Sequence, residues 1–195
     1  MQITPEQANH LIRSRRSIFP KMYNDKPIPY EIIWEILENA NWAPNHRHTE
    51  PWRFQVYVGK AKARLCQFLA EGYKKMTHPN NFKQAKYDKA LRKAEQSYCM
   101  IVICMKRDEN HSVPEIEETN AVACAVQNMW ISACAYGIGT YWSSPSIVYT
   151  GAMNEFLGLG TEDKCLGLMY MGYHDAPKKM RKRQPIEDKV EWIEE

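Results

Sequence analysis

The polar loop at residues 43–54 carries the densest group of side chains that could do chemistry. Asn45 offers an amide, His46 and His48 offer imidazoles, and Glu50 offers a carboxylate. Prolines and tryptophans flank these groups, so flat apolar faces lie close to hydrogen-bond donors and acceptors. Loops held between rigid elements commonly present binding and catalytic groups. The composition of this loop predicts a site for a planar polar ligand.

A second polar group, Arg15-Arg16-Ser17, follows the first predicted helix, which begins after Thr4. Guanidinium groups match the oxygens of a phosphate in pairs, and a serine hydroxyl adds a further donor. The alternative is a solvated helix end, where arginines interact favourably with the negative pole of the helix dipole. Arg181 and Arg183 form a third basic group, which alone would be interpreted as a solvated surface.

The loop residues His46, His48 and Glu50 also allow a metal-binding interpretation. Alternate residues of an extended segment point to one side, and neutral imidazoles with a carboxylate suit zinc or iron. A fourth ligand is not apparent in the sequence. The six cysteines stand singly in apolar segments without a Cys-x-x-Cys pair, which predicts reduced thiols in the core.

The periodicity of apolar residues predicts the elements that position these groups. Further helices are expected at residues 30–42, 60–76, 117–136 and 153–157, and strands at residues 54–58, 98–105, 139–145 (with a turn) and 165–173. Residues 78–96 are lysine-rich with weaker periodicity and are interpreted as a mobile helical segment that could act as a lid. The order predicts one α+β domain over residues 1–195, with helices around a small sheet.

Two helices have apolar residues that need a partner surface. The first helix is expected to bury a stripe formed by Ala8, Leu11 and Ile12. The helix at residues 117–136 is apolar around nearly its whole circumference, so it should be buried on all sides. We therefore expect part of it to face a second subunit, and its small residues to permit close approach there; these are Ala121, Ala125 and Ala133.

Bulk properties exclude several classes of function. The net charge of +3 arises from 26 basic and 23 acidic residues, which does not indicate a nucleic-acid-binding protein. No run of about 20 apolar residues is present to cross a bilayer, and the N-terminus lacks the layout of a signal peptide. The expectation is a cytoplasmic protein that binds neither nucleic acid nor membrane.

The order and context of these motifs resemble the nitroreductase family over nearly the whole chain. The motifs are Arg15-Arg16-Ser17, Ala43-Pro44-Asn45-His46, Asn110-His111-Ser112-Val113-Pro114, Trp142-Ser143-Ser144 and the basic tail. The resemblance implies an α+β sandwich with a mostly antiparallel sheet flanked by helices. It also implies an intertwined homodimer that holds FMN at the subunit interface, oxidises NADH or NADPH in ping-pong fashion, and reduces a nitroaromatic, quinone or similar small-molecule acceptor.

The resemblance also implies contacts for individual residues. The residues that it places at FMN are Arg15, Arg16, Ser17, Asn45, His46, His48, Trp142, Ser143, Ser144, Arg181 and Arg183. The basic residues and Ser17 would hold the phosphate and ribityl chain, and the residues from 142 to 144 would line the isoalloxazine ring. Segment 132–137 is similar to a region that meets the nicotinamide cofactor. No side chain is needed as a nucleophile, and His46 is a possible proton donor.

Two positions depart from the pattern of the family. Phe19 stands where many relatives have an arginine, and Glu50 stands where they commonly have a neutral glutamine. These differences alter the electrostatics around a flavin and leave the acceptor open. A protein that stores or senses FMN without turnover stays an alternative to the enzyme, and the metal-binding module is a third.

Overall fold

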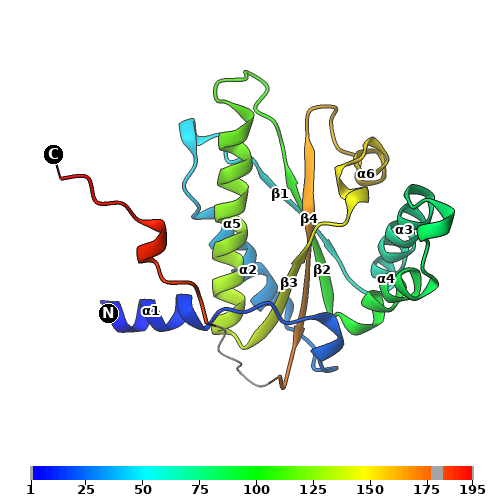
Figure 1. Ribbon diagram of the computed structural model, residues 1–195, viewed down its shortest axis with the longest axis horizontal. Coiled ribbons are helices and arrows are strands. Elements are labelled where there is room, and N and C mark those ends of the chain that lie inside the picture. Colours follow the sequence, from blue (N-terminus) through cyan, green and yellow to red (C-terminus); the bar gives the residue numbers. More distant parts are fainter. Residues whose placement is uncertain (1, 177–181, 195) are drawn as a thin grey trace.

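A four-stranded antiparallel sheet forms the centre of the computed structural model, which describes residues 2–176 and 182–194. The strands are β1 (Trp52–Tyr57), β2 (Cys99–Met105), β3 (Ile138–Ser143) and β4 (Lys164–Tyr173), in the spatial order β1-β2-β4-β3. β2 and β4, the most continuously apolar segments, occupy the centre because both of their faces are covered. β1 and β3 form the edges (Figure 1).

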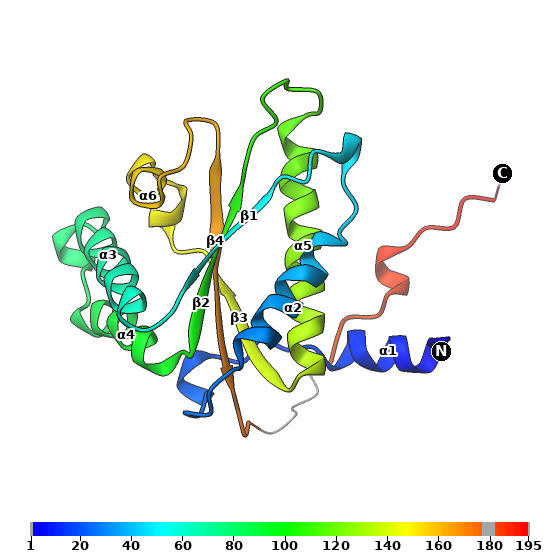
Figure 2. The same cartoon turned by 180° about the vertical axis from the view of Figure 1, so that it is seen from behind.

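Helices cover both faces of this sheet (Figures 1 and 2). The α-helices are α1 (Pro5–Ser14), α2 (Tyr30–Asn41), α3 (Lys60–Met76), α4 (Gln84–Gln96), α5 (Glu115–Ala135) and α6 (Gly151–Leu157). Short 3-10 helices are η1 (Pro20–Met22), η2 (His46–His48), η3 (Pro79–Asn81), η4 (Ser146–Tyr149) and η5 (Glu187–Lys189). α2 and α5 pack on one face, and α3, α4 and α6 lie on the other. The predicted α+β class and the antiparallel sheet flanked by helices are confirmed.

The alternation of side chains along the strands divides the apolar residues into two cores. In β2, Ile101 and Ile103 face α2 and α5, whereas Met100 and Val102 face the layer of α3 and α6. All four side chains are fully buried. Because the side-chain period of a strand is two, this register sends alternate residues of the edge strand β3 to opposite faces as well.

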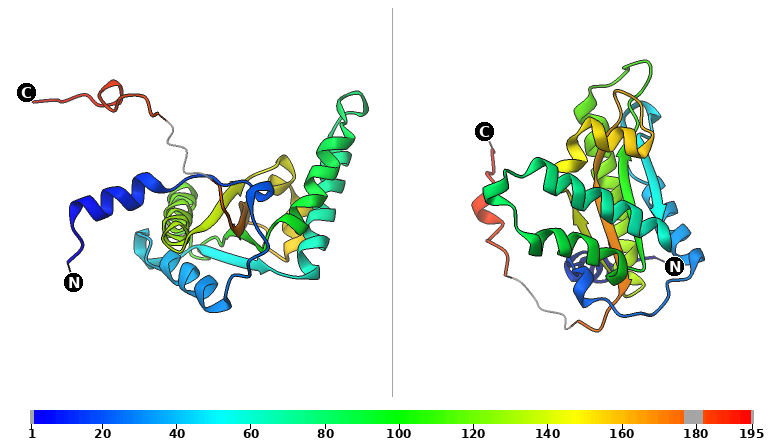
Figure 3. Two further views of the ribbon diagram at one scale, coloured as in Figure 1. Left: turned by 90° about the horizontal axis from the view of Figure 1, so that it is seen from below. Right: turned by 90° about the vertical axis from the view of Figure 1, so that its right-hand side faces the viewer.

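The first helix forms where predicted, but its apolar stripe is not buried. Thr4 Oγ1 accepts a hydrogen bond from the backbone of Gln7, whose side chain accepts one from the Thr4 backbone, so the capping box is present. α1 then projects away from the sheet (Figure 3), and none of its residues is buried within the chain. The expectation for Ala8, Leu11 and Ile12 is therefore wrong for a single chain.

The long helix α5 is buried on one side only. Val122, Val126 and Met129 are fully buried against the sheet and α2, whereas Ile116 is 62% exposed. The small residues expected to meet a partner lie in this internal core instead; they are Ala121, Ala125 and Ala133. They were misassigned because apolarity on all sides of a helix does not reveal which side its own sheet covers.

The cysteines are all free, and four of them are buried, as expected for core thiols. The two exceptions are Cys134, which is half-buried, and Cys124, which is exposed; both lie on α5. Across the described ranges, no helix has both the length and the apolarity to cross a membrane.

Candidate functional site

Arg15 lies at the C-terminal end of α1, where the chain turns back toward the sheet. Its guanidinium carbon lies 4.4 Å from the centroid of the Trp130 ring on α5, so the cation is stacked on an aromatic face. The Nη1 atom of Arg15 is buried and has no hydrogen-bond partner. A buried donor without a partner costs about 1–3 kcal/mol, which a bound acceptor would recover.

Two further arginines lie around Arg15. Burial lowers the pKa of Arg15, and repulsion from Arg183 and then Arg16 lowers that pKa further. None of the three forms an ion pair with an acidic residue in the described part of the chain. Three cations held together without a counter-ion favour a polyanionic ligand, and a phosphate monoester has the matching charge and geometry.

The predicted roles of the other basic residues are partly changed. Arg16 directs its Nη1 to the backbone carbonyls of Arg13 and Arg15, so this donor holds its own turn. Arg183 is the member of the tail that is placed near Arg15. Arg181 lies outside the described residues.

Ser17 connects the arginine group to the edge of the sheet. It forms an isolated bridge with Thr140 of β3, and the amide of Ile18 donates a hydrogen bond to the Thr140 carbonyl over 2.9 Å. The segment from Arg15 to Phe19 therefore runs beside β3. Since β3 is an edge strand, this segment and the end of the strand at Ser143 lie along one border of the sheet.

The turn after β3 is positioned by Trp142. Its indole Nε1 donates to the carbonyl of Leu166 over 3.1 Å, and the ring packs in the core beside α2 and α5. The ideal Cβ position of Gly167 lies only 2.5 Å from this Nε1, so a side chain at residue 167 would displace the indole. The indole of Trp142 is thus held in place by the core, while Ser143 is part-exposed and Ser144 is exposed; the predicted contacts of these three residues with a flavin stay a prediction.

The loop of residues 45–50 folds as a tight, strained turn. Asn45 Oδ1 accepts a hydrogen bond from the amide of Glu50 over 3.1 Å and closes the turn. Arg47, His48 and Glu50 have φ values of 52°, 54° and 42°, in the left-handed region that non-glycine residues rarely adopt. Such residues cost about 1–3 kcal/mol each, and they concentrate at functional sites.

His46 is held by the beginning of α5. Its Nδ1 lies 2.6 Å from Glu117 Oε2, which fixes the orientation of the imidazole. His46 retains 56% of its side-chain exposure, so the imidazole stays at the surface. The sequence did not reveal Glu117 as the partner of His46, because the two residues are far apart in the chain.

The metal-binding interpretation of this loop is not supported. No group of three His, Cys, Asp or Glu side chains suitable for a metal ion occurs in the ranges that the structure describes. The interpretation required an extended segment, but residues 46–48 form a 3-10 turn with left-handed positions. His46, His48 and Glu50 therefore do not point to one side.

One chain does not bring the two predicted groups together. His46 meets α5 at Glu117 in its first turn, whereas Arg15 meets α5 at Trp130 in its last part. Thirteen residues of α-helix span about 20 Å at 1.5 Å per residue. The loop and the arginine group thus lie near opposite ends of the same helix (Figure 1).

The predicted nicotinamide segment, residues 132–137, ends α5 and contacts α2. Ser132 Oγ accepts a hydrogen bond from Asn39 over 2.8 Å, and the hydroxyl of Tyr136 donates to Glu35. Ala135, Tyr136 and Gly137 are exposed, which contrasts with their apolar sequence. This segment therefore lies at the surface between the two helices.

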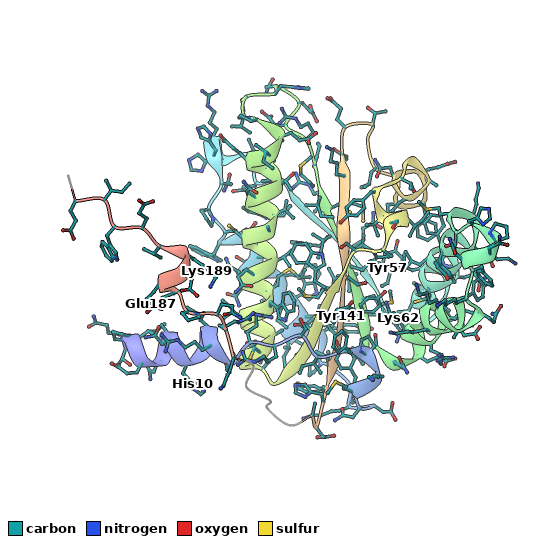
Figure 4. All side chains as sticks on the ribbon, in the orientation of Figure 1. His10, Tyr57, Lys62, Tyr141, Glu187 and Lys189 are labelled. Atoms are coloured by element: carbon teal, nitrogen blue, oxygen red, sulfur yellow. The ribbon has the colours of Figure 1, made fainter. Side chains whose placement is uncertain are left out.

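A pocket of about 440 Å³, here named the α4 pocket, was not predicted from the sequence. Its lining residues are Phe19, Pro20, Lys21, Lys89, Arg92, Lys93, Gln96 and Tyr141. Tyr141 is labelled on β3 in Figure 4. The spacing of the α4 residues by three and four positions places them on one side of the helix, a signal that was available in the sequence of residues 84–96.

Known proteins are similar to this chain in both sequence and fold. The model described as the nitroreductase family matches residues 12–173. YfhC of Bacillus subtilis (strain 168), named "Putative NAD(P)H nitroreductase", is 32% identical over 181 residues, covering 92% of this chain and 90% of that protein. The crystal structure of a nitroreductase-like family protein from Bacillus cereus is 26% identical with a TM-score of 0.82, covering 100% of both chains.

The fold extends to more distant proteins. The FMN-dependent nitroreductase NfnB from Mycobacterium smegmatis, crystallised in complex with NADPH, is 17% identical with a TM-score of 0.74 and covers 96% of this chain and 98% of that one. At this identity the likeness concerns the fold alone. The predicted sandwich is confirmed, and the family match over most of the sequence shows that this chain belongs to the nitroreductase family.

Proposed function

We propose that this protein is an FMN-dependent oxidoreductase that takes hydride from NADH or NADPH and reduces a small nitroaromatic, quinone or similar acceptor in two half-reactions. The observation that carries the cofactor is the arginine group, where Arg15 has a buried donor without a partner and lies near Arg183 without a described counter-ion. Family membership supports the assignment, because relatives bear the names of NAD(P)H nitroreductases.

The residues of the arginine group fit a flavin phosphate. Arg15 and Arg183 would bind its oxygens, and the exposed Ser17 would donate from the adjoining edge of β3. The backbone and hydroxyl groups of Ser143 and Ser144 would then lie beside the ring system, farther along the same border. When bound, FMN supplies the hydride chemistry that no arrangement of side chains provides.

We propose further that two copies of the chain complete each site. Asn45, His46 and His48 lie about 20 Å along α5 from the arginine group, too far to contact the same flavin within one chain. In a two-fold symmetric dimer, the loop of one subunit can meet the arginine group of the other. The exposed outer side of α5, including Ile116, would form part of that interface.

His46 is the proposed proton donor in this arrangement. Its Nδ1 is held by Glu117, and 56% of its side chain stays exposed. A histidine has a suitable pKa range to transfer protons near neutrality. For a nitro acceptor, a hydride from the nicotinamide and one proton convert the nitro group to a nitroso group with release of water.

The decisive experiment is an anaerobic absorption spectrum of the purified protein supplied with FMN, recorded before and after addition of NADH and then NADPH. Flavin bands that bleach with either nucleotide are expected, and a nitroaromatic or quinone should then restore them. Bound flavin that is not reduced by either nucleotide would favour the storing or sensing protein. Absence of FMN binding would overturn the cofactor assignment.

A further inference from the structure

The first turn of α5 carries three glutamates, and each has a different partner. Glu118 is buried and paired with Arg107, and Glu115 is paired with a lysine of β4. The Oε2 atom of Glu117 lies 2.6 Å from His46 Nδ1, and within the described residues Glu117 forms no ion pair with a lysine or arginine. Of the three carboxylates, that of Glu117 is therefore the one that contacts a residue of the proposed site.

This contact determines which nitrogen of His46 carries a proton. An ionised carboxylate has only acceptor atoms, so a hydrogen bond between Glu117 Oε2 and His46 Nδ1 requires the proton on Nδ1. In a neutral imidazole with a proton on Nδ1, the other nitrogen has a lone pair. The hydrogen bond thus selects the Nδ1–H tautomer of the neutral ring.

The other histidines with a described ring contact have the opposite arrangement. His78 and His174 each accept a hydrogen bond at Nδ1 from the backbone amide two residues further on, over 3.3 Å and 3.2 Å. His111 uses Nε2, which lies 3.2 Å from Glu162 Oε2. All three contacts place the proton of a neutral ring on Nε2. Among the histidines whose ring contacts are described, His46 alone is expected to keep its proton on Nδ1.

The two elements that hold this pair are both anchored. On the loop side, the side chain of Asn45 closes the turn that contains His46. On the helix side, Glu117 precedes the buried Glu118, whose pairing with Arg107 holds the first turn of α5. The helix dipole also favours a carboxylate in this turn. The imidazole is therefore fixed through its backbone and through its Nδ1 atom.

We propose that Glu117 is a positioning residue of the reaction, which makes Nε2 the atom from which His46 donates a proton to the reduced acceptor. A charged imidazole has a proton on each nitrogen. When the Nε2–H bond breaks and a bond forms between that proton and an acceptor oxygen, the electron pair stays on Nε2. The neutral ring then retains Nδ1–H and its bond to Glu117, and a proton from solvent restores the charged ring.

A carboxylate that selects the tautomer of a histidine has a precedent in the Ser-His-Asp triad of hydrolases. There the aspartate holds the imidazole in the productive tautomer and orientation without becoming protonated itself. Glu117 would act on His46 in the same way. This inference rests on the proposed function, because it assigns a residue to the proton transfer of that same enzyme.

The first test does not depend on turnover. Protein labelled with nitrogen-15 in its histidines, with and without added FMN, gives long-range proton–nitrogen correlation spectra near pH 8.5, about two units above the ordinary histidine pKa. His46, assigned by the loss of its signals in His46→Asn, should show the pattern of the Nδ1–H tautomer. In Glu117→Ala the proton should lie mainly on Nε2. A wild-type His46 with its proton on Nε2 would overturn the proposal.

Glu115→Ala is the matched control. It removes a carboxylate from the same turn of α5, and the lost ion pair with Lys164 has an exposure similar to that of the pair between His46 and Glu117. The tautomer of His46 should remain unchanged in this variant. An equal change in Glu115→Ala and Glu117→Ala would sink the inference, because the first turn as a whole would then be responsible.

The second test separates the two half-reactions by stopped-flow absorption. Hydride transfer from NADH or NADPH needs no proton from His46, so the rate of flavin bleaching in Glu117→Ala should be unchanged. Reoxidation by nitrobenzene should slow by about 10- to 100-fold, because a positioned general acid contributes about 10²–10⁴-fold and its loss of position removes part of this. Equal slowing of both half-reactions would indicate a structural defect and contradict the assignment.

Failure of this inference is distinguishable from failure of the proposed function. If neither nucleotide bleaches the flavin but the tautomer of His46 depends on Glu117, the pairing exists and its role in a reaction is overturned. If Glu117→Ala changes the tautomer while bleaching and reoxidation both stay normal, the enzyme stands and the positioning role of Glu117 falls.

Discussion

Single residues near the two ends of α5 carry the proposed cofactor site. Arg15 combines stacking on Trp130 with a buried donor that lacks a partner, and Arg183 and Arg16 add positive charge without a described counter-ion. A structural arginine would normally be paired with a carboxylate or fully hydrogen-bonded. The missing partner is the reason to expect an anion at this position.

Replacing Arg15 by glutamine should weaken FMN binding by about 10- to 100-fold, which corresponds to the loss of one or two charge-assisted hydrogen bonds. Titration of the apoprotein with FMN, followed by flavin fluorescence, measures the change. Arg13→Gln is the control, because Arg13 is exposed on the last turn of α1 and should leave the affinity unchanged. Unchanged FMN affinity in Arg15→Gln would remove the phosphate assignment.

Asp108 stabilises the loop that precedes α5 through hydrogen bonds with Ser112. Its Oδ2 accepts hydrogen bonds from the Ser112 amide over 2.9 Å and from the Ser112 hydroxyl over 2.5 Å. The hydroxyl and then the amide of Ser112 lower the pKa of Asp108. The preceding residue, Arg107, is paired with the buried Glu118, so this loop fixes the start of α5 and with it the partner of His46.

A Ser112→Ala variant should therefore lose stability in a pH-dependent way. A carboxyl with a lowered folded-state pKa stabilises the fold above its unfolded pKa of about 3.9, and this contribution is lost as the pH falls through the folded value. The drop in Tm of Ser112→Ala should be largest near neutrality and should narrow in acid. Ser146→Ala, at an exposed serine, is the control; a pH-independent difference for Ser112→Ala would contradict the argument.

At the scale of elements, Gly167 of β4 lies between β2 and β3 and contacts both strands. Gly167 has φ 131° and follows the residue whose carbonyl binds the Trp142 indole. The register between β2 and β4 shifts beside it, which is the mark of a β-bulge. A Cβ at residue 167 would lie 2.5 Å from Trp142 Nε1 and 2.9 Å from the backbone oxygen of Ser143. The glycine therefore positions the turn that contains Ser143 and Ser144.

Gly167→Ala should lower the free energy of unfolding by about 3 kcal/mol, since overpacking adds to the cost of the backbone conformation. Gly158→Ala is the matched control: its φ is 67°, but no atom lies within 4 Å of its ideal Cβ. It should cost only about 1 kcal/mol. Urea denaturation monitored by circular dichroism gives both values, and equal losses would show that contact with Trp142 contributes nothing.

The whole molecule has apolar surfaces that a single chain leaves uncovered. α1 and the tail segment with η5 both project from the same side of the body, where Figure 4 labels His10, Glu187 and Lys189. Trp192 is 84% exposed and Ile193 is 82% exposed. Large exposed apolar residues on projecting segments indicate association. In the proposed dimer, a second copy of the chain would cover these segments, in keeping with the intertwined arrangement that the family resemblance implies.

The paired substitution Trp192→Ser/Ile193→Ser should shift the protein from dimer toward the 22.8-kDa monomer. Removing two interface side chains of this size costs on the order of 2–4 kcal/mol of association free energy. Sedimentation velocity over a dilution series measures the shift. Tyr149→Ser, which is 66% exposed on η4 away from the tail, should leave the dimer intact. A wild-type protein that sediments as a flavin-loaded monomer would refute the proposed dimer.

Local sequence patterns determined most of the elements of this protein. Three patterns depend only on neighbours in the chain, so the helices and strands that they form could be predicted directly. They are the capping box of α1, the continuous apolar runs of β2 and β4, and the spacing of apolar residues in α2 and α3. The motifs around Arg15 and Trp142 also indicated the family. The role of residues 78–96 as a lid stays a prediction, although their helix, α4, is confirmed.

Contacts between distant residues were decided only by the tertiary structure. Three features depend on which surfaces meet after folding. His46 pairs with Glu117, α1 is exposed, and the small residues of α5 face the core; these are Ala121, Ala125 and Ala133. The metal-binding interpretation required an extended chain, but residues 47–50 form a turn with left-handed positions, which contradicts that interpretation. The sequence thus determined the local elements and their chemistry, whereas the structure decided which groups share a site, since proximity in space is set by packing.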